Sequence, residues 1–508
     1  MANKIDSNIT GLRYAEEVSL RTLPVTPIFY PLEPNSYSDF GGQISTIARN
    51  PINPSRQRKK GVTTDLDASG GFNQDLTINN TTRLLQGFFF ADIRQKKTTQ
   101  PMNGAAVPLT GVTGSSKTFA AASALTGFTT GHLVLATGFS VTANNGLKTV
   151  ASPSTATAVV VTETITDEVS PPATATLSAV GFQFPSADVQ VTLNGSLVRL
   201  QATATNMTTL GLIPGEWVYV GGDGAAYSFA TSVGFARISK IEATFIEFDK
   251  VSWTGATAEA GTGKTVRIFY GDVLKNESDP SLIKRRTYQV ERTLGLDSNG
   301  TMSEYLVGAV PNELTLNIAQ ADKVSMDLTF VAVDNEQRTG SQGVKAGTRP
   351  SLNPASAFNT SSDFARIKLS LVSELDPAPQ PLFAFATDMA LSINNNVSPN
   401  KAIGVLGAFD TSAGTFEVGG NMTAYFADVV AAQAVRNNSD VTVDIIMLKK
   451  NIAMLWDIPL LSLGDGRLSV EQDQAITLPL ETNAAESKFN HTLLFQSFAY
   501  LPDAAGGM

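Results

Sequence analysis

Short stretches in which apolar and polar residues alternate recur along the whole chain, and this pattern constrains the fold more than any other feature. The stretches are rich in β-branched residues and are separated by turn-forming residues, as expected for β-strands with one buried face. Alternation dominates over helical periodicity, so the sequence predicts a mainly β protein. The clearest examples are TYQVERTL (287–294), NELTLNIA (312–319), KVSMDLTFVAV (323–333), DFARIKLSLV (363–372) and VTVDIIML (441–448).

Two segments instead have the character of helices, and one lies in each half of the chain. TTRLLQGFFFADI (81–93) follows a cluster of Asn and Thr residues suited to capping a helix. ADVVAAQAVR (427–436) is rich in alanine and is followed by two asparagines. A β-rich chain with one helix in each half suggests that a single domain has been duplicated.

The spacing of residues ahead of the two helices supports this duplication. NPSRQRKKGVTTDLDASGGF (53–72) and VSPNKAIGVLGAFDTSAGTF (397–416) share the order Pro, basic residue, Gly, Asp, Ser, Gly, with the glycines ten residues apart. An ordered match of this length is improbable by chance. We predict equivalent turns in which Asp and Ser side chains bond to the backbone. The matched pairs are Gly61 and Gly404, Asp67 and Asp410, Ser69 and Ser412, and Gly71 and Gly414.

The first copy is interrupted by an insertion, most of which is poor in charge. Within it, the glycine spacing of GFTTGHLVLATG (127–138) recurs in GLIPGEWVYVGG (211–222). We therefore expect two tandem β-sandwich or barrel domains, each with one flanking helix, plus two small inserted β-barrel-like modules. The predicted boundaries are 1–100 with 256–280 for the first domain, 101–205 and 206–255 for the modules, and 281–508 for the second domain.

Composition excludes several classes of function. The chain has no cysteine, so disulfide frameworks, cysteine-bound metals and thiol nucleophiles are impossible. Its two histidines, His132 and His491, are interpreted as core or surface residues. A net charge of −9 argues against a protein that mainly grips nucleic-acid phosphates. No signal peptide or membrane span is apparent, so we expect a soluble protein made in the cytoplasm, with no catalytic, metal or cofactor-binding residue assigned.

Two short motifs imitate ligand sites but are interpreted as structural. AEAGTGKT (258–265) fits a loose phosphate-loop pattern, yet the residues after it predict a strand where that loop requires a helix. DLDASGG (65–71) imitates the start of a calcium loop, yet Leu76 occupies the position that requires a bidentate Glu. We expect a flexible hairpin and a structural turn, respectively.

The most concentrated charge lies in RNPINPSRQRKKG (49–61). A solvated loop and an electrostatic contact with an acidic face of another subunit both explain this segment. A nucleic-acid patch is a third and weaker explanation, because no aromatic residues interleave with the cations. The cations are Arg49, Arg56, Arg58, Lys59 and Lys60.

Two parts of the sequence resemble the tail tube (major tail) proteins of long-tailed bacteriophages. The first is ISTIARNPINPSRQRKKGVTTDLDASGGFNQDLT (44–77) with TTRLLQGFFFAD (81–92). The second is LSINNNVSPNKAIGVLGAFDTSAGTFEVGGNMTAYFAD (391–428) with EQDQAITLPLETN (471–483). The likeness covers about 1–100 and 256–508 and does not explain the insertion.

The resemblance implies a structural virion protein, not an enzyme, whose domains join edge to edge into stacked rings that form a hollow tail tube for DNA ejection. Most members have one domain and form hexameric rings, so a duplicated chain implies trimeric, pseudo-hexameric rings. The basic loop would reach the adjacent ring. Replacing Arg56, Arg58, Lys59 and Lys60 together by Glu should then prevent polymerisation of a folded protein.

The implied partners are further copies of the chain and other tail proteins, such as the tape measure, tail terminator and distal tail proteins. DNA would pass an acidic or neutral lumen without specific binding, and the inserted modules would decorate the tube exterior, where the host surface is within reach. The implied location is the virion tail, after assembly in the host cytoplasm. The alternative is a multi-domain phage adhesin, a receptor-binding or baseplate subunit whose modules contact the host surface.

Overall fold

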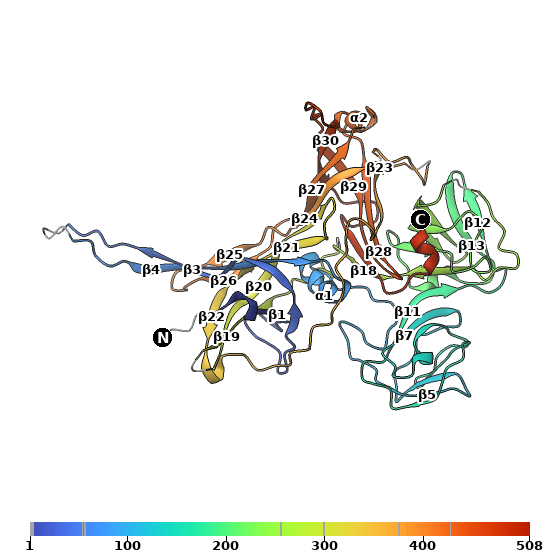
Figure 1. Ribbon diagram of the computed structural model, residues 1–508, viewed down its shortest axis with the longest axis horizontal. Coiled ribbons are helices and arrows are strands. Elements are labelled where there is room, and N and C mark those ends of the chain that lie inside the picture. Colours follow the sequence, from blue (N-terminus) through green and yellow to red (C-terminus); the bar gives the residue numbers. More distant parts are fainter. Residues whose placement is uncertain are drawn as a thin grey trace.

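The computed structural model describes residues 5–52, 54, 57–254, 257–297, 300–373, 376–383, 385–426 and 428–507. Strands dominate it and the described residues contain two α-helices, so the predicted mainly β fold class is confirmed. Figure 1 shows a central β body with a long hairpin projecting from one end and the inserted strands at the other. No described helix is long and apolar enough to span a membrane.

The first half of the body is assembled from strands on both sides of the insertion. In one layer β2, β1, β19, β20 and β22 pair, and in the other β3, β4 and β21 pair with the far end of β20. These elements are β1 (Gly11–Glu16), β2 (Tyr30–Leu32), β3 (Pro34–Ile47), β4 (Val62–Asp75), α1 (Ile78–Phe89), β19 (Tyr288–Asp297), β20 (Gly300–Ala319), β21 (Ser325–Ala332) and β22 (Asp334–Arg338).

The second half repeats this plan in chain order. In one layer β23, β28, β29 and β31 pair, and in the other β24, β27 and β30 pair with the far end of β29. These elements are β23 (Phe364–Leu371), β24 (Ala386–Asn394), β25 (Ser398–Lys401), β26 (Ala408–Ser412), β27 (Glu417–Tyr425), α2 (Val430–Arg436), β28 (Val441–Lys449), β29 (Ile452–Asp465), β30 (Thr477–Ala484) and β31 (Leu494–Phe498).

The long strands β20 and β29 hold equivalent places in the two halves. Each contributes to both layers, and each has a register shift beside a proline, Pro311 or Pro459. Proline has no N–H to donate to a ladder and is therefore tolerated at such bulges, where a strand bends. This shared topology supports the duplication. It groups β19 to β22 with the first copy, although the predicted boundary lies at residue 281; the domain boundaries stay a prediction.

The side chains between the layers and the helices form one large core that spans both halves. Helix α1 contributes Leu84, Leu85 and Phe88, which are fully buried at helical spacing. It ends where Phe90 adopts a left-handed conformation. The helix predicted over 81–93 therefore begins and ends earlier, whereas α2 lies within its predicted range. All five stretches predicted as strands coincide with β19, β20, β21, β23 and β28.

The insertion contains a four-stranded and a nine-stranded sheet over two hydrophobic cores, which meet near residue 180. The sequence placed that boundary at 205, and the module limits likewise stay a prediction. The strands are β5 (Leu109–Thr113), β6 (Thr118–Ala121), β7 (His132–Thr137), β8 (Gly146–Thr149), β9 (Ala158–Val160), β10 (Glu168–Val169), β11 (Thr176–Gln183), β12 (Val189–Asn194), β13 (Leu197–Ala202), β14 (Trp217–Val220), β15 (Gly234–Glu242), β16 (Phe245–Val251) and β17 (Arg267–Tyr270). The chain then re-enters the body as β18 (Asp272–Lys275), which pairs with β31.

Buried ion pairs fix the second inserted core to the second half of the body. Arg237 on β15 lies 3.0 Å from Asp249 on β16 and 3.2 Å from Asp457 on β29. Lys250 on β16 pairs with Asp444 on β28. Burial raises the pKa of the Asp457 carboxyl, and the Arg237 guanidinium opposes that rise. Buried charges persist only when they are paired, so these contacts hold the insertion at a defined place on the body.

Candidate functional site

The inner layers of the two halves join through β20 and β24 into one eight-stranded sheet, which we call the joined sheet. Its strand order is β3, β4, β21, β20, β24, β27, β30 and β29. The seam between the halves is a regular antiparallel ladder that runs from Glu313 opposite Asn394 to Ala319 opposite Asp388. One chain therefore presents an uninterrupted sheet surface.

One face of the joined sheet is covered by the core, and the other, which we call the polar face, carries small and polar side chains. Along β20, Leu314 and Leu316 are buried, whereas Thr315 and Asn317 lie on the opposite face. The cross-strand partners of Thr315 continue the polar face from one edge to the other. That row, from β3 to β29, is Ser36, Asn73, Asp327, Thr315, Ser392, Gly419, Asn483 and Ser462.

The polar face is acidic, and neutral amides bond to its acids. Asp327 accepts hydrogen bonds from Asn73 (2.8 Å) and Asn317 (2.7 Å). The row through Thr315 contains no Lys or Arg; at the margin of the face, Lys323 pairs with Asp75. Amide partners carry no positive charge that would offset the acids, so the surface repels polyanions. The acids are Asp75, Glu313, Asp327, Asp388, Glu417 and Glu481.

The joined sheet has two open edges. Within the described residues β3 pairs with β4 alone, and residues 462–465 of β29 pair with β30 alone. Such edges present backbone groups that can pair with another strand. In the duplicated plan β3 corresponds to β24 and β29 corresponds to β20. The two open strands are therefore the counterparts of the two strands that pair at the seam inside the chain.

The hairpin of β3 and β4, which we call the arm, projects from the body (Figure 1). Its strands have 14 residues each, which corresponds to ~45 Å. Pairing ends at Ile47 opposite Val62, and the segment beyond carries the predicted basic loop. Within the described residues Arg49, Arg58, Lys59 and Lys60 are exposed without an ion pair, and Arg56 lies outside the described residues.

The predicted repeat turn is wrong for most of its positions. Asp67, Ser69 and Gly71 lie inside β4, where their spacing reflects alternation along a strand. The two glycines that begin the repeat, Gly61 and Gly404, are the ones placed where the chain turns or where a side chain would clash with the backbone. A side chain at Gly61 would lie 2.9 Å from the Ile47 carbonyl oxygen, where the arm strands begin to pair. In the second copy Asp410 and Ser412 lie in β26, Gly414 follows it, and Gly404 takes a φ of 88° between β25 and β26.

The short hairpin of β25 and β26 lies against the base of the arm. Lys401 on β25 forms ion pairs with Asp65 and Asp67 on β4. The hydrogen bond from Lys401 holds the pKa of Asp65 below its ordinary value. Asp410 on β26 lies 3.1 Å from Arg285. The charges of the short hairpin are thus paired within the chain, unlike the cations at the tip of the arm.

The two histidines and the two loop motifs take structural places. Burial lowers the pKa of His132 to about 4 and that of His491 to about 3, so both are neutral core residues. The Gly-rich loop at 258–265 leads into strand β17, as predicted. Leu76 is fully buried, and the described residues contain no group of three or more acids or histidines placed to hold a metal ion.

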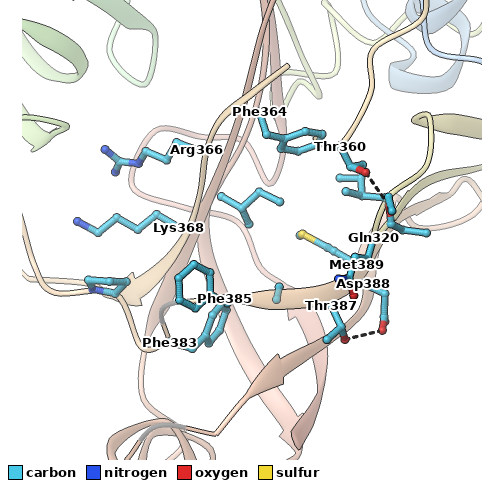
Figure 2. A pocket seen from close by; sticks show the side chains of 16 residues that line it. Gln320, Thr360, Phe364, Arg366, Lys368, Phe383, Phe385, Thr387, Asp388 and Met389 are labelled. Carbon is cyan, nitrogen blue, oxygen red and sulfur yellow. Dashed lines mark hydrogen bonds between the residues drawn. The ribbon is translucent and has the colours of Figure 1, made fainter. Parts of the chain in front are cut away.

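A groove of about 560 Å³ opens beside β23, and its walls are mainly apolar (Figure 2). Phe383, Phe385 and Met389 lie along it, while Arg366 and Lys368 extend from β23. Burial, with Arg366 next in effect, lowers the pKa of Lys368 to about 8. The acid in the lining of the groove, Asp388, accepts a hydrogen bond from the hydroxyl of the adjacent Thr387. The residues that line the groove do not form a nucleophile and base pair.

Comparison with known proteins agrees with the sheet geometry. A family model for the phage tail tube protein matches residues 215–484, which is more than half of the chain and includes the seam strands β20 and β24. The chain belongs to the phage tail tube protein family. It is therefore a structural component of the phage tail, in a family whose members associate with one another and with other tail proteins. No curated protein matches the chain.

The family match extends into the insertion, which the sequence resemblance does not cover. The resemblance leaves the insertion out, whereas the family match begins at residue 215, inside the predicted module at 206–255. It therefore includes β15 and β16, which carry Arg237, Asp249 and Lys250. The strands that are fixed to the body by buried charges thus lie within the part of the chain that the family model describes.

Proposed function

We propose that this protein polymerises into stacked rings that form the hollow tail tube through which phage DNA is ejected. Each ring contains three chains and has pseudo-sixfold symmetry. The observation that carries the proposal is the joined sheet, whose open edges belong to the same strand types that pair at the seam inside the chain. Closure of a ring consumes both edges, which would otherwise promote uncontrolled pairing.

The internal seam serves as a template for the contact between chains. Strand β3 of one chain would pair antiparallel with the end of β29 of the next, as β24 pairs with β20. The polar faces of all copies would then line one channel. In a lumen covered by carboxylates and amides, Lys323 at the margin is already paired with Asp75, so DNA passes without being retained.

The arm would face the adjacent ring, and the insertion would lie on the outside of the tube. The arm extends to the adjacent ring, where its exposed cations meet acids of another copy. The inserted modules decorate the exterior and reach the host surface. The ends of the tube meet the tape measure, tail terminator and distal tail proteins. The polymer assembles in the host cytoplasm and remains in the virion tail.

Electron microscopy of the purified protein tests this proposal. We expect hollow filaments whose image reconstructions show three chains in each ring and the eight-stranded sheets facing the channel. Six chains per ring would overturn the stoichiometry. Discrete oligomers without filaments, at protein concentrations well above those of a virus-producing cell, would instead favour the adhesin class.

A further inference from the structure

A second exposed surface in the described part of the chain combines apolar side chains with acids, and so complements the apolar and basic tip of the arm. Aliphatic and aromatic side chains gather at the end of the second copy where β27, α2 and the loop from β29 to β30 converge. We call this surface the end patch. The Phe426 amide donates to the Ile476 carbonyl over 3.0 Å, which ties β27 to the loop. The exposed apolar residues are Tyr425, Val429, Val430, Leu468, Val470 and Ile476.

Acidic side chains lie within and next to the segments that form the end patch. Within the described residues none of these acids forms an ion pair, and all are exposed. Two cations, Arg436 and Arg467, also lie in this region, so acids outnumber bases there. The acids are Asp428, Asp440, Asp465, Glu471 and Asp473.

The tip of the arm has the complementary composition. It exposes Ile47 (63%) and Ile52 (107%) beside cations that have no acidic partner in the described part of the chain. In Figure 1 the arm and α2 project in different directions from the body, and the tip lies far from α2. Any contact between the arm tip and the end patch would therefore join two copies of the chain.

Each surface occurs in only one of the two halves. The second copy has the short hairpin in place of the arm. The first copy has a short connection, residues 320–324, where the second has the loop over residues 466–476. One chain thus offers one arm and one end patch on different regions. A contact between unlike surfaces on successive rings can repeat from ring to ring, which is the geometry of an open-ended polymer.

We infer that the end patch of one chain receives the arm tip of a chain in the adjacent ring, with Val470, Glu471 and Asp473 among the contacting residues. This inference rests on the proposed function, since it names the partner surface for the arm. Apolar contact supplies affinity, and the opposite charges align the two surfaces.

Exchange of charges tests the pairing. We expect Glu471→Lys with Asp473→Lys, and separately Lys59→Glu with Lys60→Glu, each to lower the sedimentable filament fraction at least about tenfold. The protein that carries all four changes should recover to within about threefold of the unmodified chain. Glu242→Lys with Glu486→Lys is the matched control and should leave the filament fraction unchanged.

The outcomes separate this inference from the proposed function. Suppose that the unmodified protein forms tubes but the protein with all four substitutions polymerises no better than the proteins with either pair. The end patch is then not the partner of the arm. If the unmodified protein forms no tubes, the proposed function itself fails.

A second measurement does not depend on charge. The chain has no cysteine, so Ile52→Cys with Val470→Cys introduces the only thiols. A short bismaleimide should then produce ladders of linked chains in filaments. Ile52→Cys with Val169→Cys, which places the second thiol at an exposed position on the insertion, should not. Absence of ladders from the first variant would overturn the inference.

Discussion

The two copies in this chain share a strand order but differ in the hairpin that precedes the helix. In the first copy the hairpin is the arm, with 14 residues per strand and exposed cations. In the second copy β25 and β26 have four and five residues, Lys401 pairs with acids at the base of the arm, and Asp410 pairs with Arg285. The same place in the fold is thus a long projecting hairpin in one copy and a short hairpin with paired charges in the other.

This difference shows how a duplicated domain can divide its tasks. The seam, the core and the polar face need both copies and keep the same plan in each. The arm and the insertion belong to the first copy, and the long loop of the end patch belongs to the second. Elaborations therefore occur at connections, where they do not disturb the pairing that both copies share.

The largest effect is expected from reversing the charge of the arm. Arg56→Glu, Arg58→Glu, Lys59→Glu and Lys60→Glu together should lower the filament fraction at least about tenfold, because the arm would repel acids on the adjacent ring. Sedimentation and electron microscopy measure this loss, and circular dichroism checks that the fold persists. Lys240→Glu reverses the charge at an exposed position on the insertion and is the control, since its ion pair is with Glu242 of the same strand. Normal tubes from the arm variant would refute the division of roles.

The next largest effect, on the free energy of unfolding, is expected where the insertion meets the second copy. Arg237→Met leaves Asp457 buried without its ion pair, which should lower the free energy of unfolding by about 3–5 kcal/mol. Lys240→Met, which removes an exposed pair with Glu242, should cost about 0.5 kcal/mol. Urea denaturation compares the two variants. Equal losses would show that the buried pairs do not hold the insertion to the second copy.

The polar face tests whether both copies line one channel. Glu313→Lys, Asp388→Lys and Glu481→Lys together should leave tubes intact and increase the retention of short duplex DNA about tenfold at low salt, with a decline as salt rises. Bound DNA should resist nuclease because it lies inside the tube. Asp167→Lys, Glu242→Lys and Glu486→Lys place the same charge elsewhere on the chain. Nuclease-sensitive binding by both variants would contradict a luminal position of the polar face.

The smallest effect is expected at the short hairpin. Lys401→Met removes the ion pairs with Asp65 and Asp67 and should lower Tm by about 2 °C or less, because these residues are partly exposed. The bonded carboxylate has a lowered pKa, so its contribution is present above the ordinary Asp pKa and is lost as pH falls through the lowered value. Thermal unfolding should therefore show the difference at pH 7 and lose it progressively as the pH falls through the lowered pKa. A difference that persists in acid would contradict this origin.

Much of the fold could be predicted from the sequence because alternation and helical spacing are local signals. The strands around Thr315 and Val443, and both helices, follow from their own residues. The polar face could not be predicted, because Thr315, Asp327 and Asn73 become neighbours only through strand pairing. The pattern of each strand shows that one side is polar but not which strands share it.

The candidate site was predicted in part. The cations at 49–61 mark the arm directly, because a dense charge run needs no partner to be recognised. The turn predicted at Asp67, Ser69 and Gly71 was wrong because small and acidic residues suit both a turn and an open strand face. The end patch could not be predicted, since β27 and the loop after β29 are brought together only by the fold, as in the hydrogen bond from Phe426 to Ile476.

The seam inside the chain also has a kinetic consequence. In a ring of three chains, half of the contacts between sheets are already made when each chain folds, at the effective concentration set by a covalent connection. Ring formation then requires fewer encounters between separate molecules than a ring of single-domain subunits. Nucleation should accordingly depend less steeply on protein concentration, so a duplicated subunit can start a polymer while it is still scarce.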